Sequence, residues 1–265
     1  MPAPLHPNRP KSMLWGLRES LRHLALLVRN PHDPDTHAAR FIDSTEGTSQ
    51  ARAYEEFVGL ESSAPLVASL PDPVLLLEDR PALAAAAPAS LGRVYLDFLE
   101  ANDLRLGHIM DLVAEFSDRR SEDAPRAWFR RRTAAAHDLR HVLTGYDASH
   151  LGEYCNLCFR FAQTGHRGVG VLIGFAAIVL LAEGNLRVFS AGLEAWRRGR
   201  SSAAIDLFPW EDYLRSPLAE ARAALGLTPS RHFPDQIEPG AYGLTPAARG
   251  SGAAARRFDQ IRMPA

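Results

Sequence analysis

Apolar residues recur at helical spacing along most of this 265-residue chain. In residues 12–29 they are separated by Arg and Glu, which predicts an amphipathic helix. Its apolar positions are Leu14, Leu17, Leu21, Leu24, Leu27 and Val28. Asp33-Pro34 predicts a short helix to about Ser44, and Thr48 can cap another that reaches Leu60, because Asp and Thr accept hydrogen bonds from free N–H groups and Pro fits a first turn.

The signals are weaker between these helices and Ser90. Val74–Leu77 is apolar, but Pro71 and Pro73 interrupt the helical pattern, and no neighbouring segment offers a strand to pair with. We therefore interpret this stretch and the alanine-rich residues 82–89 as connecting chain.

Strong helical signals begin at Ser90. One apolar stripe consists of Leu91, Val94, Tyr95, Phe98 and Leu99, and a second of Ile109, Leu112, Val113 and Phe116. Ser121 to Pro125 marks the start of a helix that ends at Gly145, and the next helix, capped by Asp147 or Ser149, reaches about Thr164 before Gly165. Further helices are expected over Val169–Ala182, over Leu186–Arg198 before Gly199, and from Pro217 to Leu225.

These elements predict an all-α fold, a single-domain irregular helical bundle over residues 1–229. The helices of residues 12–60 are expected to pack against a core formed by residues of about 90–227. The apolar run Val169–Ala182 has 14 residues, fewer than the roughly 20 that span a bilayer, so we interpret it as a buried helix. Residues 230–265 are rich in Pro, Gly, Ala and Arg, which predicts a mobile C-terminal tail.

Composition is that of an ordinary globular protein, with 46% hydrophobic and 23% charged residues. The net charge of -1 gives no global attraction to nucleic acid or to an anionic membrane, so any basic patch must be local. Cys155 and Cys158 are the only cysteines, which excludes a disulfide-stapled secreted scaffold. No secretory signal pattern follows the N-terminus. A cytoplasmic protein of a GC-rich bacterium is expected.

Two histidines and two acids have the spacing of a metal site. His137 and His141 lie at i and i+4 of a predicted helix, about 6 Å apart at Cβ, with Asp138 one step round. Glu153 follows the Gly145–Asp147 turn, on the first turn of the next helix, where an antiparallel helix pair would bring it back to the histidines. We predict that His137, Asp138, His141 and Glu153 bind a divalent metal between two consecutive helices. Zinc is the first candidate, with iron, manganese and magnesium as alternatives.

The face of this helix roughly opposite the histidines is expected to pack; it carries Trp128, Ala135, Leu139, Val142 and Leu143. An alternative to the metal site is a pair of hydrogen-bonded histidines on an ordinary amphipathic helix, with Glu153 as a first-turn acid. The pattern also differs from the His-Glu-x-x-His of zinc proteases.

Other polar residues near the predicted site have simpler interpretations. Cys155 and Cys158 are expected to pack in the core rather than form a metal or redox site. His150 and His166 are expected at the surface or at helix caps. Arg130, Arg131 and Arg132 are interpreted as a solvated charge run, with Arg130 near the histidine face, where an anionic head group could meet it.

Several motifs resemble the coenzyme Q biosynthesis protein 4 family. The most specific is the run His137-Asp138-Leu-Arg-His141-Val-Leu-Thr-Gly145-Tyr146-Asp147, followed by Leu151-Gly152-Glu153. Further matches are Ser90-Leu91-Gly92-Arg93, Tyr95, Phe98, Ala162-Gln163, Trp196-Arg197-Arg198-Gly199, Trp210-Glu211, Pro217-Leu218, Arg222 and Leu225-Gly226. They cover about residues 90–227. Arg140 departs from the family, which more often has an apolar or aromatic residue there.

The resemblance implies an all-helical fold, peripheral association with a membrane, and an apolar channel near the metal that accepts a polyprenyl tail. Val169–Ala182 could line that channel. The family acts in ubiquinone synthesis and is implicated in removing the carboxyl group from ring carbon 1 of a polyprenyl-hydroxybenzoate, with oxidation at that carbon. It is also described as organising the other enzymes of the pathway. We therefore expect a polyprenyl lipid or quinone precursor as ligand, quinone-biosynthesis enzymes as partners, a homodimer, and a place on the inner face of the bacterial membrane.

Three functions remain open at this point. The first is a metal-dependent decarboxylase of the ubiquinone pathway, or a paralogue acting on another prenylated or aromatic metabolite. The second is a non-catalytic lipid-binding scaffold for the quinone biosynthetic enzymes. The third is a metal-dependent hydrolase unrelated to quinones, which the His-Asp-x-x-His spacing alone would allow.

Overall fold

Helices make up the regular structure of the part of the chain that is described, as the apolar spacing predicts. The computed structural model describes residues 22, 26, 38, 41, 42, 45, 49–106, 123–233 and 237. The α-helices whose bounds lie within these residues are α3 (Ser49–Val58), α4 (Ala64–Ser69), α5 (Pro73–Glu78), α6 (Arg80–Ala85), α7 (Leu91–Ala101), α9 (Ala124–Thr144), α10 (His150–Thr164), α11 (Arg167–Ala182), α12 (Arg187–Ser201), α13 (Trp210–Tyr213) and α14 (Leu218–Ala224). Short 3-10 turns cover Glu61–Ser63 and Ile205–Leu207.

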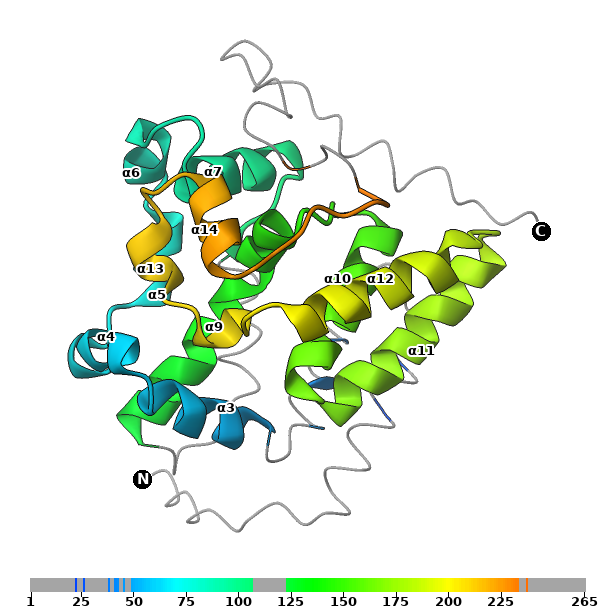
Figure 1. Cartoon of the computed structure of the whole chain (residues 1–265), viewed down its shortest axis with the longest axis horizontal. Helices are drawn as coiled ribbons and strands as arrows, with labels where there is room; N and C mark the ends of the chain where they lie inside the picture. Colours follow the sequence, from blue (N-terminus) through cyan, green and yellow to red (C-terminus); the bar gives the residue numbers. More distant parts are fainter. Residues whose placement is uncertain are drawn as a thin grey trace, which may run out of the picture.

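Helix α9 is the element around which the others are arranged. It contacts α3, α5, α7, α10 and α14, and in Figure 1 it crosses the middle of the molecule, with α10, α11 and α12 to its right. Its predicted packing face is confirmed, since Ala135, Leu139, Val142 and Leu143 are fully buried and Trp128 is nearly so. One large hydrophobic cluster joins α5, α6, α7, α9, α10, α12 and α14, so the expectation of an all-α single-domain bundle is correct.

Small residues let α10 and α12 approach closely. A Cβ atom on Gly192 would lie 2.7 Å from the Tyr154 ring, and one on Gly199 would lie 2.5 Å from the carbonyl oxygen of Phe159. The prediction that Gly199 ends its helix is wrong, because α12 continues to Ser201. Gly199 serves the contact between two helices rather than a helix end.

The predicted boundaries of α9 and α10 are confirmed. Asp123 caps α9, and Gly145 ends it with a positive φ of 80°. Of the two candidate caps for α10, Ser149 is the one used, because its side chain accepts a hydrogen bond from Gly152 N. Gly165, at φ 63°, ends α10. The chain between the two halves of the predicted metal site is therefore a short, defined turn.

The interpretation of Val74–Leu77 and of residues 82–89 as connecting chain is wrong. Helices α5 and α6 occupy most of this region. Their prolines lie in the first turn, and Asp72 and Asp79 cap the two helices through Val74 N and Ala82 N. Pro is compatible with that position because the first N–H groups of a helix lack partners in any case. The prolines therefore start helices here.

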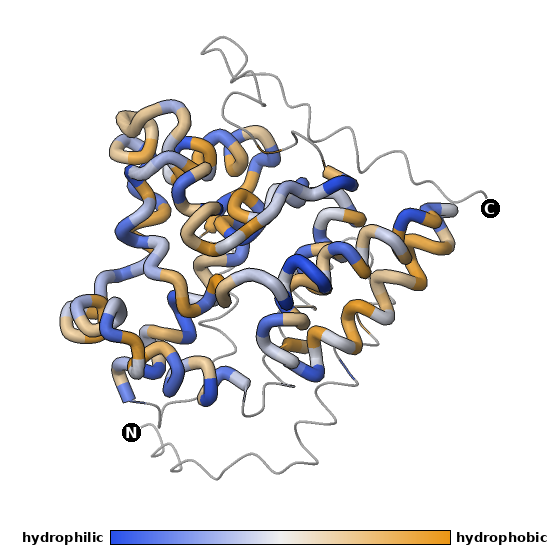
Figure 2. The backbone as a smooth tube through the Cα atoms, viewed as in Figure 1, coloured by the Kyte–Doolittle hydropathy of each residue, from blue (hydrophilic) through white to orange (hydrophobic). Residues whose placement is uncertain are grey.

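Helix α11 is only partly buried, contrary to the prediction for its apolar run. Leu172 and Leu180 are buried, but Val171 is 46% and Ile178 67% exposed. Figure 2 shows that hydrophobic residues dominate the helix along its length. Within the described residues, no helix is both long and apolar enough to cross a membrane.

The ends of the chain are described at few positions. Of the predicted helix 12–29 only Arg22 and Leu26 are described, and the predicted stripe from Ile109 to Phe116 lies outside the described residues. Ala38, Phe41 and Ile42 are helical as expected, and Phe41 packs on Leu172 of α11. The predicted mobile tail from residue 230 is wrong at its start, because Phe233 and Ile237 are buried in the main cluster.

Candidate metal centre

The end of α9 that carries the histidines is fixed by two arginines. The last carbonyl groups of a helix have no partner within it. Here Arg222 donates to the carbonyl oxygens of Val142 and Leu143, at 3.0 and 3.1 Å. Arg198 donates to that of Thr144, at 2.8 Å. Helices α14 and α12 therefore hold the last turn of α9 in place.

The turn after α9 sets the position of Glu153. Asp147 accepts hydrogen bonds from Ser149 N and Oγ, and Ser149 in turn caps α10. A Cβ atom on Gly152 would lie 1.9 Å from the carbonyl oxygen of Asp147. Only glycine therefore lets the turn pass this close beneath the first turn of α10, where the next residue is Glu153.

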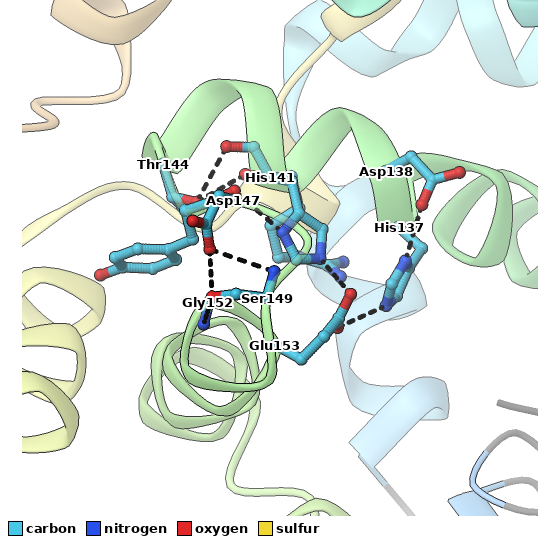
Figure 3. A network of polar contacts seen from close by, with 10 residues as sticks. His137, Asp138, His141, Thr144, Asp147, Ser149, Gly152 and Glu153 are labelled. Carbon is cyan, nitrogen blue, oxygen red and sulfur yellow. Dashed lines mark hydrogen bonds and ion pairs between the residues drawn. The ribbon is translucent and has the colours of Figure 1, made fainter. Parts of the chain in front are cut away.

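The structure brings three of the predicted ligands together. One ligand atom each from His137, His141 and Glu153 lie within 4.8 Å of one another. The distances are 3.2 Å from His141 Nε2 to Glu153 Oε1 and 3.8 Å from His137 Nε2 to Glu153 Oε2. Figure 3 shows the Glu153 carboxylate from α10 pointing at the two imidazoles of α9.

The remaining ring nitrogens determine which tautomer each histidine adopts. His141 Nδ1 lies 3.0 Å from the carbonyl oxygen of Tyr146, which can only accept a hydrogen bond, so this nitrogen donates. His137 Nδ1 lies 3.1 Å from Asp138 Oδ1 and donates to that carboxylate in the same way. In the neutral form of each ring the lone pair is then on Nε2, the atom that faces Glu153.

Two lone pairs and the carboxylate that they face are all hydrogen-bond acceptors, so a positive charge between them would stabilise the arrangement. His141 Nε2 is buried and makes no hydrogen bond of acceptable geometry, although Glu153 Oε1 is close. A divalent cation would satisfy both nitrogens and the carboxylate, and second partners on Nδ1 are the usual support of metal-binding histidines. The donor set of two imidazoles and one carboxylate fits zinc and similar ions and leaves coordination positions free.

Protons can supply that charge when no metal is bound. Burial lowers the pKa of His141, but Glu153, Asp138 and the Tyr146 carbonyl outweigh it, so its pKa is raised above the usual value. Burial raises the pKa of Glu153, yet the positive charge of His141, with His137 and His150, lowers it to about 2. The cluster is therefore expected to be charged whether the positive charge comes from a bound ion or from a protonated histidine.

Asp138, the fourth predicted ligand, does not join the other three. Its carboxylate is buried behind the His137 ring, on the side away from Glu153 (Figure 3). In this position it fixes the orientation of His137. Sequence spacing had no means of showing this, because Asp138 is adjacent to His137 in the chain and spacing does not say which way its carboxylate points.

Among the described residues, the cluster is exposed at His137 and Glu153 and buried at His141. His141 is buried, and its ring stacks on Phe98 of α7, with centroids 5.7 Å apart and planes at 17°. By contrast, the side chains of His137 and Glu153 are 35% and 42% exposed. A ligand of the ion must therefore approach along the His137–Glu153 edge. Phe98 and the Tyr146 carbonyl were not among the predicted site residues, because a backbone carbonyl leaves no signal in a sequence and the ring of Phe98 has the spacing of an ordinary core residue.

The other candidate groups do not join the cluster. Cys155 and Cys158 are free and buried, as expected for packing, and burial raises the pKa of both thiols. His166 caps α11 but is buried, whereas His150 is exposed. The interpretation of Arg132 as part of a solvated charge run is wrong, because it is fully buried and paired with Glu211.

Comparison with known proteins agrees with this arrangement. The family model described as coenzyme Q (ubiquinone) biosynthesis protein Coq4 matches residues 76–231, more than half of the chain. The chain belongs to the Coq4 family. A crystal structure of a Nostoc punctiforme protein, whose name refers to ubiquinone biosynthesis, superposes with a TM-score of 0.57 at 18% sequence identity. The match covers 80% of this chain and 96% of that one. A search of curated protein sequences gave no match.

Membership of the Coq4 family gives the chain a role in ubiquinone biosynthesis. Several Coq4-like motifs outside the metal cluster have structural tasks here. Arg198 and Arg222 hold the end of α9, and Glu211 pairs with Arg132. A Cβ atom on Gly92 would lie 2.8 Å from the carbonyl oxygen of Leu214, so α7 packs tightly on the chain before α14. The motif residues thus fix the helices that present the cluster.

Proposed function

We propose that the chain is a metal-dependent enzyme of ubiquinone biosynthesis. In this proposal His137, His141 and Glu153 hold a divalent ion, with zinc as the first choice, and Asp138 orients His137. The reaction is removal of the carboxyl group from ring carbon 1 of a polyprenyl-hydroxybenzoate. The observation that carries the proposal is the pair of Nε2 lone pairs aimed at one carboxylate, on an edge that solvent can reach.

The protein contributes a rigid and partly open site. When bound, the ion supplies positive charge that polarises the aryl carboxylate. Tyr146 and Phe98 keep the His141 ring in one orientation, and Asp138 does so for His137. The open edge at His137 and Glu153 leaves room for the substrate, while the buried His141 side excludes water.

The bond that breaks joins ring carbon 1 to the carboxyl carbon. Carbon dioxide leaves, and the electron pair that remains on the ring takes up a proton. In the oxidative form, a hydroxyl group from water takes that position, and dioxygen accepts the two electrons as hydrogen peroxide. The two forms give products that differ in mass by one oxygen atom.

The substrate class follows from the family and from the surroundings of the site. A polyprenyl tail needs apolar surface, and α11 and α12 supply exposed apolar side chains next to α10. The apolar channel, the homodimer, the inner membrane face and the association with other quinone-biosynthesis enzymes belong to this proposal as expectations. A prenyl lipid that co-purifies with the metal-loaded protein would support the lipid ligand and would argue against an unrelated hydrolase.

Carbon dioxide release from a carboxyl-labelled polyprenyl-hydroxybenzoate tests the reaction. Metal-loaded protein should release label in air. Release that persists without dioxygen indicates the non-oxidative form, release that needs dioxygen indicates the oxidative form, and mass spectrometry of the product identifies the form. His141→Ala and Glu153→Gln should abolish release and lower the metal content measured by elemental analysis. His232→Asn, a histidine outside the cluster, is the matched control and should behave as the parent protein.

Two outcomes would contradict the proposal. Unchanged metal content in His137→Ala, His141→Ala and Glu153→Ala variants would exclude the site. Normal quinone production in cells that carry only His141→Ala would favour the non-catalytic scaffold, because that function needs the apolar surfaces and not the ion.

A further inference from the structure

The Tyr146 carbonyl oxygen, which orients His141, belongs to a residue whose ring is enclosed by three other segments. The Tyr146 side chain is fully buried. Phe159 of α10 and Phe233, in the chain after α14, meet the ring edge to face, with centroids 6.4 and 5.4 Å away. The guanidinium of Arg198, on α12, lies 5.0 Å from the ring centroid. Ring and carbonyl belong to one residue, so contacts that fix the ring also restrict the position of the carbonyl oxygen.

The chain after α14 runs along α12 and is tied to it by hydrogen bonds. Figure 1 shows this segment, in orange, beside α12. Arg198 donates through Nε and Nη2 to the carbonyl oxygen of Thr228, at 2.9 and 2.6 Å. The same Nη2 donates to the carbonyl oxygen of Thr144, at the end of α9. One guanidinium thus joins the chain after α14, helix α12 and the last turn of α9.

Glu194 of α12 holds the residues that follow. Its Oε1 accepts hydrogen bonds from Ser230 Oγ and from Arg231 N, both at 2.8 Å. Hydrogen bonds to a carboxylate are stronger than those between neutral groups. We call residues 228–231 the clasp. Phe233 comes two residues after the clasp, so the clasp determines the place from which the Phe233 ring enters the core.

The other side of Phe233 is tied to α9. Ile237, four residues further, is buried, and its carbonyl oxygen accepts from Arg222 Nη2 at 2.8 Å. The same nitrogen donates to the carbonyl oxygen of Val142, at 3.0 Å. Two arginines that satisfy the end of α9, Arg198 and Arg222, therefore hold the chain on both sides of Phe233.

The hydrogen bond that orients His141 allows little movement. It measures 3.0 Å from Nδ1 to the Tyr146 oxygen, and such bonds weaken beyond about 3.2 Å. The stacked ring of Phe98 fixes the plane of the imidazole, but a half-turn of the imidazole would keep that stacking. The Tyr146 carbonyl is thus the contact that selects which nitrogen faces Glu153.

We propose that the clasp and Phe233 position the metal ligand His141 through Tyr146. Phe233 is then a positioning residue, because it acts through the residue to which His141 donates. The proposal rests on the proposed function for the ion itself, since it requires that His141 binds one. Without the Phe233 ring, Tyr146 loses one enclosing face, its carbonyl oxygen moves, and the bond to His141 weakens. The affinity for a divalent ion then falls by more than general loss of stability explains.

Zinc affinity of Phe233→Leu tests these contacts. Leu keeps much of the apolar volume but lacks the ring edge that meets Tyr146. Competitive titration with a chromophoric chelator should show affinity lowered about tenfold, the lower end of the effect of a lost outer partner. Phe57→Leu is the matched control, because Phe57 is also buried and meets Phe129 at 5.0 Å in a separate cluster. It should lose similar stability in urea and bind zinc as the parent protein does.

Substitutions of Glu194 test the clasp without changing the apolar core. Glu194→Ala removes the acceptor of Ser230 and Arg231, whereas Glu194→Gln keeps an oxygen in the same place. Zinc affinity should fall about three- to tenfold in the alanine variant and stay near that of the parent protein in the glutamine variant. Rescue by the amide is expected if the hydrogen bonds of the clasp matter rather than the charge.

Nuclear magnetic resonance of the metal-free protein observes His141 directly. A proton on Nδ1 that is held by the Tyr146 carbonyl is buried and exchanges slowly with water. Its signal should be present in histidine-labelled parent protein and in Phe57→Leu, and should broaden or vanish in Phe233→Leu. This measurement needs neither ion nor substrate, and circular dichroism checks that each variant is folded.

Two results would overturn the proposal. One is parent-like zinc affinity in the folded Phe233→Leu variant. The other is an equal loss of zinc affinity in Phe57→Leu, since general destabilisation would then be the cause. Failure of the proposed function differs from both. A parent protein that binds no zinc would refute the metal function, and the Nδ1 proton signal would still show whether Phe233 holds His141 in place.

Discussion

The two histidines of the cluster owe their orientation to groups that do not face the ion. A carbonyl oxygen accepts from His141 and a carboxylate accepts from His137, so both Nε2 lone pairs point at Glu153. Such outer partners typically change metal affinity by about 10- to 100-fold when removed. The role of Asp138 in the motif His-Asp-x-x-His therefore becomes a measurable question, distinct from the role of the three cluster residues.

Replacing Asp138 separates a ligand from an orienting residue. Asp138→Ala removes the acceptor for His137 Nδ1 and should weaken zinc binding by about 10- to 100-fold. Asp138→Asn keeps an oxygen that can accept the same hydrogen bond, so the loss of zinc affinity in this variant should be clearly smaller. Competitive titration with a chromophoric chelator measures both affinities. Equal losses in the two variants would instead indicate that the carboxylate binds the ion directly.

The lowered pKa of His166 predicts how the stability of the protein depends on pH. Burial, with Arg160 nearby, lowers the pKa of His166 from 6.5 to about 4 in the folded protein. The unfolded chain therefore binds this proton more readily, so the stabilisation is complete above pH 6.5 and is lost as the pH falls toward 4. The free energy of unfolding should fall by up to about 3 kcal/mol over this range.

Urea unfolding at a series of pH values measures this dependence. His166→Asn keeps a side chain that can cap α11 at Val169 N, the bond that His166 Nδ1 makes at 3.3 Å. The variant should unfold with a flatter pH profile between pH 6.5 and 4, the two pKa limits given above. A profile identical to that of the parent protein would show that other groups control the loss of stability at low pH.

At the scale of elements, glycine positions decide how α9 and α10 present the site. Gly152→Ala would place Cβ against the backbone of Asp147, so the turn must shift and Glu153 with it. We expect a loss of about 1 to 3 kcal/mol in stability, together with weaker zinc binding. Gly174→Ala is the control, because no atom lies within 4 Å of its Cβ position in α11. That change should stabilise the protein by up to about 1 kcal/mol. Similar effects from both alanines, in unfolding and zinc titrations, would contradict the close approach.

The sequence could predict most elements but not how each is used. Caps and terminal glycines gave the bounds of α9 and α10, since these signals act locally through Asp123, Gly145 and Ser149. Pro73 was misread because a proline can either break a helix or start one, and only the Asp72 cap bond distinguishes the two. The prediction that Gly199 ends a helix is wrong because the glycine is needed for a close contact with α10, which is distant in sequence.

At the scale of the whole molecule, burial was the hardest property to predict. Hydrophobicity alone suggested that α11 is enclosed, whereas its outer face at Ile178 is open. Charge alone suggested that Arg132 is solvated, whereas it is enclosed. In both cases burial depends on which other helices pack against the residue, and local spacing does not contain that information. The three-residue cluster was predictable because its ligands lie on consecutive helices joined by a short turn.

Arg132 ties α9 to the chain between α12 and α13. It pairs with Glu211 and donates to the carbonyl oxygens of Asp206 and Phe208. Its guanidinium also lies over the rings of Phe57 and Trp210, at 4.8 and 5.3 Å. Helices α9, α13 and α3 therefore meet at one buried charge, far along α9 from His141. Removing it should loosen the bundle as a whole without reaching the metal cluster first.

A double-mutant cycle tests this junction. Arg132→Met leaves the Glu211 carboxylate buried and unpaired, which should cost about 3 to 5 kcal/mol of unfolding free energy. Adding Glu211→Met removes that unpaired charge, so the double variant should be more stable than Arg132→Met alone. The single Glu211→Met change should cost less than Arg132→Met, because Arg132 keeps two carbonyl acceptors. Chemical denaturation measures all three, and zinc affinity of the folded variants should stay near that of the parent. Simple additivity of the two single changes would mean that the charges do not interact, and the pair would then have no part in joining the helices.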